Sequence, residues 1–561
     1  MRVDRIIRLV CVLLAGSALG AELPKLDPIR PIPPPGIQFS DADRADLEKG
    51  LGELTGEIDL LSRQLKSPLL ELLTDIRIYQ NAIRYALAYN EFFSAKDIPA
   101  AKKLLELGLE RAKQLKDGKP AWAAASGLLP RGYISRIDGS VQPYGLVIPK
   151  SYETDPDRPR RLDIWFHGRD ERLSEVNFLW QRHNNAGQFT PPDTFVLHLY
   201  GRYCNANKFA GEVDLFEALA DVKKRYAIDD NRILVRGFSM GGAACWHFAA
   251  HYAGMWAAAA PGAGFSETPY YCKYLPDPTN MPPAYEQTLW HMYDATDYAV
   301  NLFNCPTIAY SGEKDRQKQA ADMMAAALKA EGLTMTHIIG PGTEHRYHPD
   351  SKIEIDRRLD TIAGRGRNPV PQHVKFTTWT LRYNEMLWVT IDGMGRHWER
   401  ARVDAEITGE GVVKVETKNV TALTLKMPAG HCPLDVTIKP LVVLDGRKLE
   451  APPVQTDRSW TAHFRKKGRS WSVVDSPVEP GLHKRHGLQG PIDDAFMDSF
   501  IIVKPTGAAL NGRTGAWFDQ EMKHAVEQWR KTFRGEARVT TDDKLTDAEI
   551  AGNNIVLWGD F

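Results

Sequence analysis

A serine flanked by glycines stands where an apolar run of the sequence gives way to a helical run. The segment Gly237-Phe238-Ser239-Met240-Gly241 lies after residues 232–235 and before residues 243–252. Glycines two residues before and two after the serine relieve crowding in a turn whose backbone angles are strained. A serine on such a strand–turn–helix junction is typical of a nucleophile elbow, which presents the hydroxyl to an acyl carbon. The alternative is a glycine-rich turn without catalysis.

The carboxylate of a catalytic triad is expected just after the next-to-last strand of the sheet. A serine hydroxyl needs a histidine base, and that histidine needs a carboxylate to orient it. In this motif the three residues follow in the order serine, acid, histidine. Residues 310–315 occupy the expected place, and we predict Asp315 as the acid, with Glu313 as the alternative.

The histidine base is expected on the loop after the last strand. Residues 340–345 form a short loop with two glycines that ends at His345, which can return over the elbow. His348 is the alternative, and His337 lies inside the predicted strand and is assigned a structural role.

Two backbone amides should stabilise the oxyanion that forms during acyl transfer. One is the amide of Met240, directly after the nucleophile. The other is expected from His167-Gly168-Arg169-Asp170, as the amide of Gly168 or Arg169. His167 itself is expected to stabilise the loop.

Arg202 follows the apolar run 194–200, at the end where substrates bind in open α/β sheets. It can hold a substrate carboxylate bidentately, or it can tie loops together. Further along the chain, four tryptophans lie among the predicted strands of the β-rich region. They form either a carbohydrate platform or part of a core. They are Trp379, Trp388, Trp460 and Trp471.

Strand-like runs alternate with helical runs between residues 131 and 365, which predicts a doubly wound, mostly parallel α/β sheet. Two further strands, at 132–137 and 144–148, precede that alternation. The expected parallel strands are 162–166, 194–200, 232–235, 256–260, 306–310 and 335–339, and the expected helices are 215–226, 241–252 and 317–331.

The chain divides into six predicted regions. Residues 1–20 resemble a signal peptide and 21–39 a proline-rich linker, and 40–120 have the periodicity of a small helical module. The hydrolase-like domain spans 131–365, a β-sandwich-like domain 372–480, and a mixed α/β segment 487–561. The apolar strand-type residues at the very end suggest that the mixed segment is truncated.

Three arginines, Arg2, Arg5 and Arg8, precede an apolar run from Leu9 to Ala15, and small residues follow at 18–20. This pattern predicts export, and hence a secreted or periplasmic protein. No later segment reaches the length of a membrane span. The chain holds 71 Lys plus Arg and 71 Asp plus Glu, so nothing in the overall charge indicates a nucleic-acid partner. Cys272 and Cys305 are candidates for a disulfide.

The run Ile228-Asp229-Asp230-Asn231-Arg232-Ile233, leading into the elbow, resembles the prolyl oligopeptidase (S9) catalytic domain. It is also similar to feruloyl-esterase-like and polyhydroxybutyrate-depolymerase-like hydrolases, and the whole chain to large exported proteins of planctomycete-type bacteria. The resemblance covers about residues 131–359. It implies the α/β-hydrolase fold and, independently of the spacing, a triad of Ser239, Asp315 and His345.

The sequence departs from the prolyl oligopeptidase pattern in two places. No propeller sequence precedes the hydrolase region, and the family's oxyanion tyrosine has no counterpart after His167-Gly168. We therefore expect a serine hydrolase of peptides or acyl esters, without cofactor or metal. Esters on polysaccharides or polyesters are the alternative substrates. A catalytically silent, polysaccharide-binding surface protein is the competing hypothesis.

Overall fold

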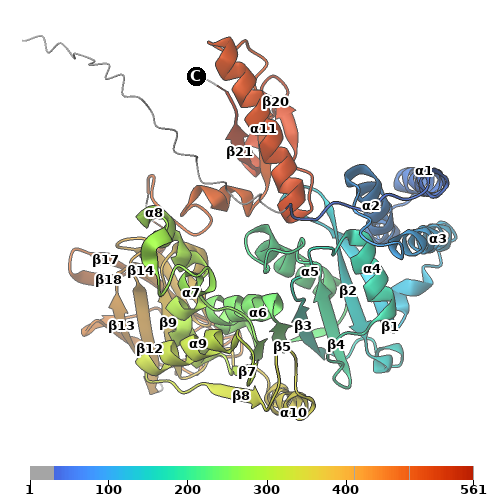
Figure 1. Ribbon diagram of the computed structural model, residues 1–561. Coiled ribbons are helices and arrows are strands. Elements are labelled where there is room, and N and C mark those ends of the chain that lie inside the picture. Colours follow the sequence, from blue (N-terminus) through green and yellow to red (C-terminus); the bar gives the residue numbers. More distant parts are fainter. Residues whose placement is uncertain (1–30, 410, 479, 560–561) are drawn as a thin grey trace, which may run out of the picture.

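The computed structural model describes residues 31–409, 411–478 and 480–559 (Figure 1). The predicted signal peptide, residues 1–20, lies outside the described residues. Within them, no helix is both long enough and apolar enough to cross a bilayer.

A sheet of eight strands forms the centre of the molecule, in the order β1-β2-β4-β3-β5-β6-β7-β8. β2 is antiparallel to both of its neighbours, and all strands from β4 to β8 run parallel. This strand order and the mostly parallel pairing are those of an α/β-hydrolase, as predicted. The strands are β1 (Gly127–Ile134), β2 (Val141–Ile148), β3 (Arg160–Phe166), β4 (Thr194–Leu199), β5 (Ile228–Phe238), β6 (Ala258–Gly262), β7 (Ile308–Gly312) and β8 (Thr336–Gly340).

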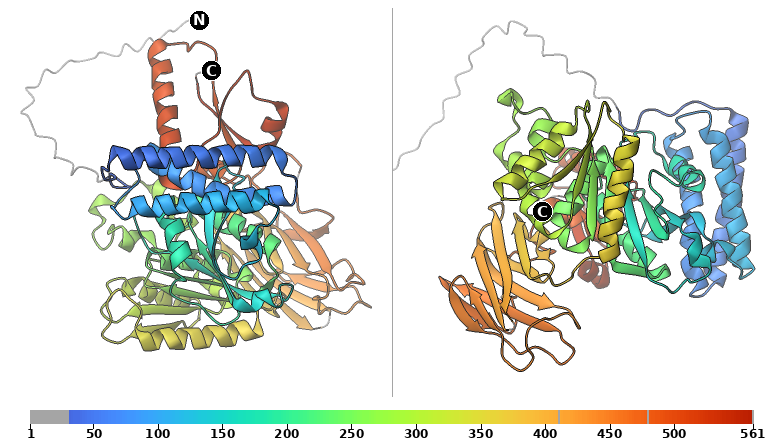
Figure 2. Two further views of the ribbon diagram at one scale, coloured as in Figure 1. Left: turned by 90° about the vertical axis from the view of Figure 1, so that its right-hand side faces the viewer. Right: turned by 90° about the horizontal axis from the view of Figure 1, so that it is seen from below.

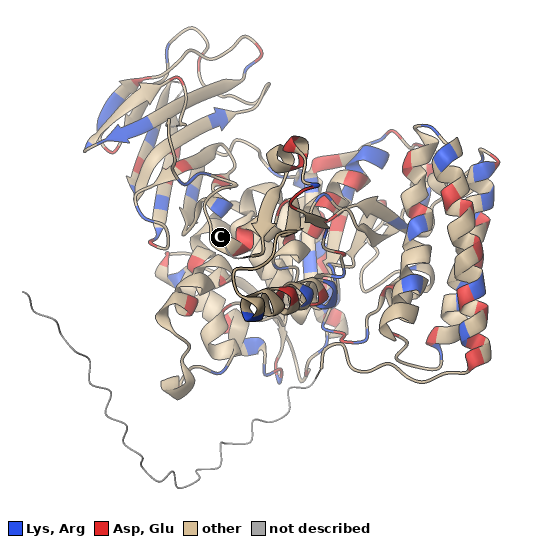
Figure 3. Ribbon diagram, turned by 90° about the horizontal axis from the view of Figure 1, so that it is seen from above, with Lys and Arg blue, Asp and Glu red and all other residues tan. Residues whose placement is uncertain are grey.

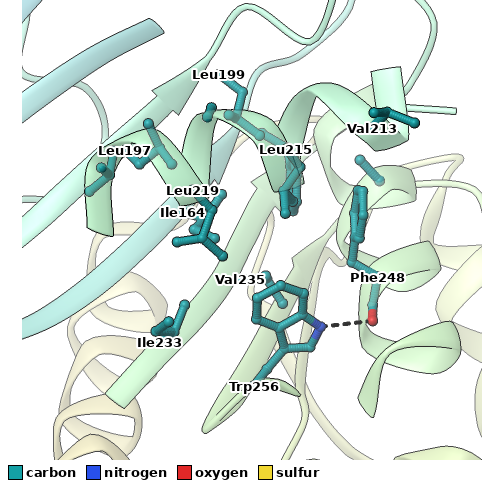
Figure 4. Packing of buried hydrophobic residues seen from close by; sticks show 14 of the residues in the cluster. Ile164, Leu197, Leu199, Val213, Leu215, Leu219, Ile233, Val235, Phe248 and Trp256 are labelled. Carbon is teal, nitrogen blue, oxygen red and sulfur yellow. Dashed lines mark hydrogen bonds between the residues drawn. The ribbon is translucent and has the colours of Figure 1, made fainter. Parts of the chain in front are cut away.

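Helices cover both faces of this sheet, because its central strands are apolar on both sides. On one face, α5 (Ala210–Arg225), α6 (Met240–His251) and α9 (Lys318–Ala330) pack against the strands, and on the other lie α4 (Glu175–Asn184) and α10 (Pro349–Arg365). Figure 4 shows the first interface, where Trp256 Nε1 donates to Phe248 O at 2.9 Å. The apolar residues of this interface are at most 3% exposed; they include Ile164, Leu197, Val235, Leu215 and Leu219.

Three helices precede the sheet: α1 (Asp41–Gln64), α2 (Thr74–Tyr89) and α3 (Asp97–Lys116). α1 and α3 run side by side in Figure 2, and α2 contacts β1 and α4. Leu47, Leu54 and Leu61 form the packing face of α1, since all three are fully buried, and this agrees with the helical periodicity of the segment.

Two five-stranded sheets follow the hydrolase. One has the order β10-β11-β14-β17-β18 and the other β16-β15-β13-β12-β9, with β13 and β15 parallel and the remaining pairs antiparallel. Trp388, Trp460 and Trp471 are at most 1% exposed, so these three are core residues and do not form a platform. The strands are β9 (His373–Thr378), β10 (Glu385–Met386), β11 (Val389–Met394), β12 (Ala401–Gly409), β13 (Val412–Lys418), β14 (Val420–Met427), β15 (Leu441–Leu444), β16 (Arg447–Glu450), β17 (Trp460–Lys467) and β18 (Ser470–Val474).

The last described segment is a three-stranded parallel sheet, β20-β19-β21, with two helices. Its elements are β19 (Phe500–Lys504), α11 (Gly512–Phe533), β20 (Val539–Thr541), α12 (Asp547–Gly552) and β21 (Asn554–Leu557). The C-terminal end of α11 contacts Glu91, which lies just after α2, and Glu175, the first residue of α4. We call the charged cluster there the α11 joint; it consists of Glu91, Glu175, Arg530 and Arg534.

Arg530 Nη1 lies 2.8 Å from Glu175 Oε1 and its Nη2 lies 3.2 Å from Glu91 Oε2, while Arg534 binds the other oxygen of Glu91. All four side chains are at most 6% exposed. Elsewhere, basic and acidic residues are interspersed along the chain (Figure 3).

Several sequence expectations need correction. The first two strands are longer than predicted, and α4 and α10 were not predicted at all. Between β6 and β7 the chain forms short helices, α7 (Thr268–Tyr271) and α8 (Ala284–Leu289). Cys272 and Cys305 are both free, so the disulfide considered between them does not form. Cys305 is buried in the hydrolase core, whereas Cys272 lies exposed at the end of α7.

Candidate active site

Ser239 occupies a strained turn between β5 and α6. Its φ of 60° and ψ of −122° are angles that a residue with a side chain rarely adopts. The turn is so tight that the second residue before the serine and the second after it have no room for a side chain. A Cβ on Gly237 would lie 2.1 Å from Gly241 O, and one on Gly241 would lie 2.0 Å from Phe166 O. Ser239 N donates to Gly262 O at 2.9 Å and ties the turn to the neighbouring strand.

Asp315 and His345, the residues predicted as acid and base, lie within hydrogen-bond distance of each other. His345 Nδ1 lies 2.8 Å from Asp315 Oδ2. The carboxylate side chain is 3% exposed and the imidazole 40% exposed, so the buried acid orients a ring that solvent or substrate can reach. Asp315 lies on the loop after β7, and Asp315 N donates to Gly312 O at 3.2 Å, which anchors that loop to the strand end.

The alternative residues have other contacts. Glu313 accepts a hydrogen bond from Gly342 N at 2.6 Å, which fixes the histidine loop rather than the histidine. His348 is the residue that precedes α10, and its Nδ1 is buried without a hydrogen-bond partner among the described residues. His337 Nε2 lies 3.0 Å from Ser311 Oγ, within the sheet.

The imidazole lies next to the elbow. The ring of Phe238, directly before the nucleophile, has its centroid 4.9 Å from that of His345. In the described part of the chain, no hydrogen bond joins Ser239 to His345. The hydrogen bond between a nucleophile and its base often forms only when substrate binds, so its absence fits an enzyme without substrate.

Two backbone segments meet at the position where an oxyanion would form. Met240 is the first residue of α6, and the amides of a first helical turn have no carbonyl acceptor within their own helix. Gly168 lies across from it, and a Cβ placed there would be 3.8 Å from Ser239 Cβ. The side chain of Arg169, the next residue, turns to Glu171, with Arg169 Nε donating to Glu171 Oε1 at 2.9 Å.

His167 holds this loop in place, as expected. Its Nδ1 lies 2.8 Å from Gly168 O and its Nε2 lies 3.1 Å from Tyr200 O. Burial lowers the pKa of His167, which favours the neutral ring. The loop that carries the proposed oxyanion amide is therefore braced against the end of β4.

Arg202 is not part of the site. It is fully buried, and its Nη1 lies 3.0 Å from Asp138 Oδ2, which is also fully buried. Asp138 additionally accepts a hydrogen bond from Trp529 Nε1 at 2.8 Å. The guanidinium therefore cannot reach a substrate, and Arg202 ties loops together, the second of its two predicted roles.

A cavity of about 770 Å³ has His345 and Phe238 in its wall. We call the part lined by Gly168, Phe238 and His345 its upper end; residues of α4 and α10, among them Arg182 and Lys352, line the rest. We call this cavity the α4–α10 groove. The groove has no counterpart among the sequence expectations, because neither helix was predicted. Its lower lining includes Trp165, Gln181, Arg182, Asn185, Gln188, His198, Arg346 and Lys352.

Residues 204–361, which include Ser239, Asp315 and His345, match the model of the prolyl oligopeptidase family. No curated protein matches the chain.

Among solved structures, a putative dipeptidyl aminopeptidase IV from Bacteroides ovatus is 14% identical, with a TM-score of 0.32, and the match covers 42% of this chain and 35% of that one. The chain thus spans about a third of that protein. An S-formylglutathione hydrolase from Staphylococcus aureus is 16% identical, with a TM-score of 0.30, over 42% of this chain and 98% of that one. The family match thus covers the segment that carries the strained turn and the Asp315–His345 pair.

Proposed function

We propose that this protein hydrolyses ester or peptide bonds through an acyl-serine intermediate on Ser239. The observation that carries the proposal is the 2.8 Å pair of His345 and Asp315, placed beside a strained serine turn. The prolyl oligopeptidase match over the same residues supports the proposal.

The arrangement suits both halves of such a reaction. His345 Nε2 takes the proton of the Ser239 hydroxyl while the serine oxygen bonds to the substrate carbonyl carbon. The carbonyl oxygen becomes an oxyanion beside the amides of Met240 and the Gly168 loop. The imidazolium then gives its proton to the leaving alcohol or amine, whose bond to carbon breaks. Water attacks the acyl-serine in the same way and releases the acid.

Asp315 contributes by holding the imidazole in one tautomer. Its Oδ2 accepts the Nδ1 proton of His345, so Nε2 is left free to act as the base. The carboxylate is shielded from water and stabilises the imidazolium that forms during the reaction.

The surroundings of the sheet favour ester substrates alongside short peptides. The residues described before the hydrolase form helices that contact β1 and α4 rather than a propeller. A propeller that restricts entry to short peptides is thus missing from the described chain. We propose that acyl esters are the main substrates and that peptides are the alternative.

Covalent labelling tests the nucleophile. A fluorophosphonate probe should label the wild-type chain and Ser67→Ala, which removes an exposed serine elsewhere, and should not label Ser239→Ala. Equal labelling of Ser239→Ala would overturn the proposal. Turnover of 4-nitrophenyl esters, compared with turnover of fluorogenic proline-containing peptides, then distinguishes esterase from peptidase.

We also propose that the protein is exported. The proposal rests on the arginine-rich start, the apolar run 9–15 and the small residues at 18–20. N-terminal sequencing of the protein recovered from its native host should find a start near residue 21. Recovery of the intact N-terminus from the cytoplasm would contradict export.

A further inference from the structure

We propose that the α4–α10 groove selects substrates that carry an acidic group, and that Arg182 binds this group. The inference rests on the proposed function and adds a substrate class to it. The reacting ester or amide would lie at the upper end of the groove, beside His345. A carboxylate elsewhere on the same molecule would extend down the groove.

The groove has cationic side chains and no acidic ones. Arg182, Arg346 and Lys352 line it, and its lining contains no Asp or Glu. None of these three cations forms an ion pair with an acidic side chain among the described residues. Polar Gln181, Asn185 and Gln188 complete the wall. Such a lining attracts anions and repels cations.

Arg182 is the strongest single feature. Its aliphatic stem packs over Gly145, where a Cβ would lie 2.4 Å from Arg182 Cδ, so the side chain is fixed against β2. Its Nη1 is buried and has no hydrogen-bond partner among the described residues. The residue as a whole is partly buried. A guanidinium N–H that is shielded from water normally has an acceptor, because an unpaired polar group is costly to bury.

Other buried arginines in the same domain show what is missing. Arg131 lies 2.7 Å from Asp75, and Arg236 lies 3.1 Å from Asp163. Arg182 has the aromatic contact of such a site, with its guanidinium 6.0 Å from the Phe178 ring centroid, but lacks the carboxylate. A ligand carboxylate would supply it.

The electrostatics of neighbouring groups agree with an uncompensated positive charge. Burial alone lowers the pKa of Arg182 to about 10. The pKa of His198, deeper in the groove, is lowered well below its ordinary value by burial and, next, by the charge of Arg182. At neutral pH, Arg182 is therefore charged and His198 neutral.

A carboxylate is the chemistry that fits best. The guanidinium is planar and presents two parallel N–H groups to two oxygens, as a carboxylate requires. The groove continues to the catalytic histidine without an intervening acidic side chain. One substrate molecule of moderate length can therefore contact Arg182 and His345 together.

Matched substrates test the selection. One pair places the acidic group on the acyl side: the 4-nitrophenyl monoester of adipic acid and the same ester with its free carboxyl methylated. The other pair places it on the leaving-group side: 4-carboxyphenyl acetate and its methyl ester. We expect the wild-type enzyme to prefer the anionic member of one pair by on the order of 10- to 100-fold in kcat/KM. No preference for the anion in either pair would overturn the inference.

Arg182→Met keeps the stem and removes the charge. It should abolish the anion preference, mainly through a higher KM for the anionic ester, and it should lower kcat/KM for the anionic ester far more than for the neutral one. Arg358→Met, which removes an exposed arginine from α10 outside the groove, should keep the full preference. Equal losses on anionic and neutral esters in Arg182→Met would contradict a specific role for Arg182.

Failure of this inference is distinguishable from failure of the proposed function. Fluorophosphonate labelling of Ser239 and turnover of the neutral esters report on the proposed function alone. Calorimetric titration of Ser239→Ala with adipate monomethyl ester reports on the groove alone. Binding that Arg182→Met eliminates supports the inference, and the absence of binding contradicts it.

Discussion

Two regions of this molecule contain arginine N–H groups shielded from water. An acidic partner compensates the charge in one region and is missing in the other. At the α11 joint, Arg530 and Arg534 meet Glu91 and Glu175 within hydrogen-bond distance. In the α4–α10 groove, Arg182 has an N–H buried without any partner among the described residues. Ion pairs of the first kind hold elements together. The second arrangement lowers the stability of the fold and leaves a charge for a ligand to neutralise.

The difference follows from the cost of taking a charge out of water. A buried pair recovers much of that cost when both partners are present, and removing one partner leaves the other uncompensated. An unpaired arginine has already incurred the cost in the free protein. Changes at the joint should therefore affect stability, and changes in the groove should affect substrate selection.

The largest effect is expected at the upper end of the groove. Asp315→Asn should lower kcat by on the order of 10⁴-fold, because the amide no longer stabilises the imidazolium or enforces its tautomer. The thermal midpoint should hardly change. Initial rates on a neutral ester and a melting curve on the same sample test both statements. A fall in rate of only a few-fold would remove Asp315 from the triad.

At the joint, Arg534→Met should destabilise the fold by about 3–5 kcal/mol, since one oxygen of buried Glu91 loses its cation. The kcat/KM per folded molecule should stay near that of the wild type. Thermal melting combined with active-site titration separates the two quantities. An unchanged melting temperature would show that the joint contributes nothing to holding α11.

The cost of burying a charge can also be tested with a negative group, the buried carboxylate of Asp294. Burial raises the pKa of Asp294 to about 7, although Lys208 and the hydroxyl of Thr268 oppose the shift. Protonated Asp294 therefore contributes stability that is complete below about pH 4 and is lost as the pH rises through 7.

Asp294→Asn should consequently stabilise the protein at pH 8, by on the order of 1–3 kcal/mol, and leave it nearly unchanged at pH 4. Melting temperatures of variant and wild type at both pH values give the comparison. A difference that does not change with pH would show that the group keeps an ordinary pKa.

The smallest effect on stability is expected for Arg182→Met. Removal of an unpaired buried cation should leave the free energy of unfolding unchanged or raise it by about 1 kcal/mol. Thermal melting without ligand tests this prediction. A clear loss of stability would mean that Arg182 has a structural partner, and the contrast between groove and joint would then disappear.

The fold and the elbow were predictable because their signals are local. Gly237 is required by a contact within the turn, since a Cβ there would lie 2.1 Å from Gly241 O. Strand–helix alternation predicts the parallel sheet. Asp315 and His345 were predictable from their places after particular strands, which the structure brings to 2.8 Å.

Partners distant in the sequence were not predictable. Arg202 follows a strand at the substrate-binding edge of the sheet, and nothing nearby shows that Asp138, sixty-four positions earlier, neutralises it. Arg182 gives no sequence signal, because what distinguishes it is the lack of an acidic neighbour in space. The helices α4 and α10 that form the groove were also missed, although Ser174 accepts a hydrogen bond from Asn177 N as the cap of the first.

The α11 joint also links early and late parts of the chain. Glu91 and Glu175 leave the ribosome hundreds of residues before Arg530 and Arg534 do. Without those arginines, the two carboxylates have no cationic partner in the joint and stay hydrated. A chain that stops before residue 530 should therefore be less stable than the full chain, wherever it folds.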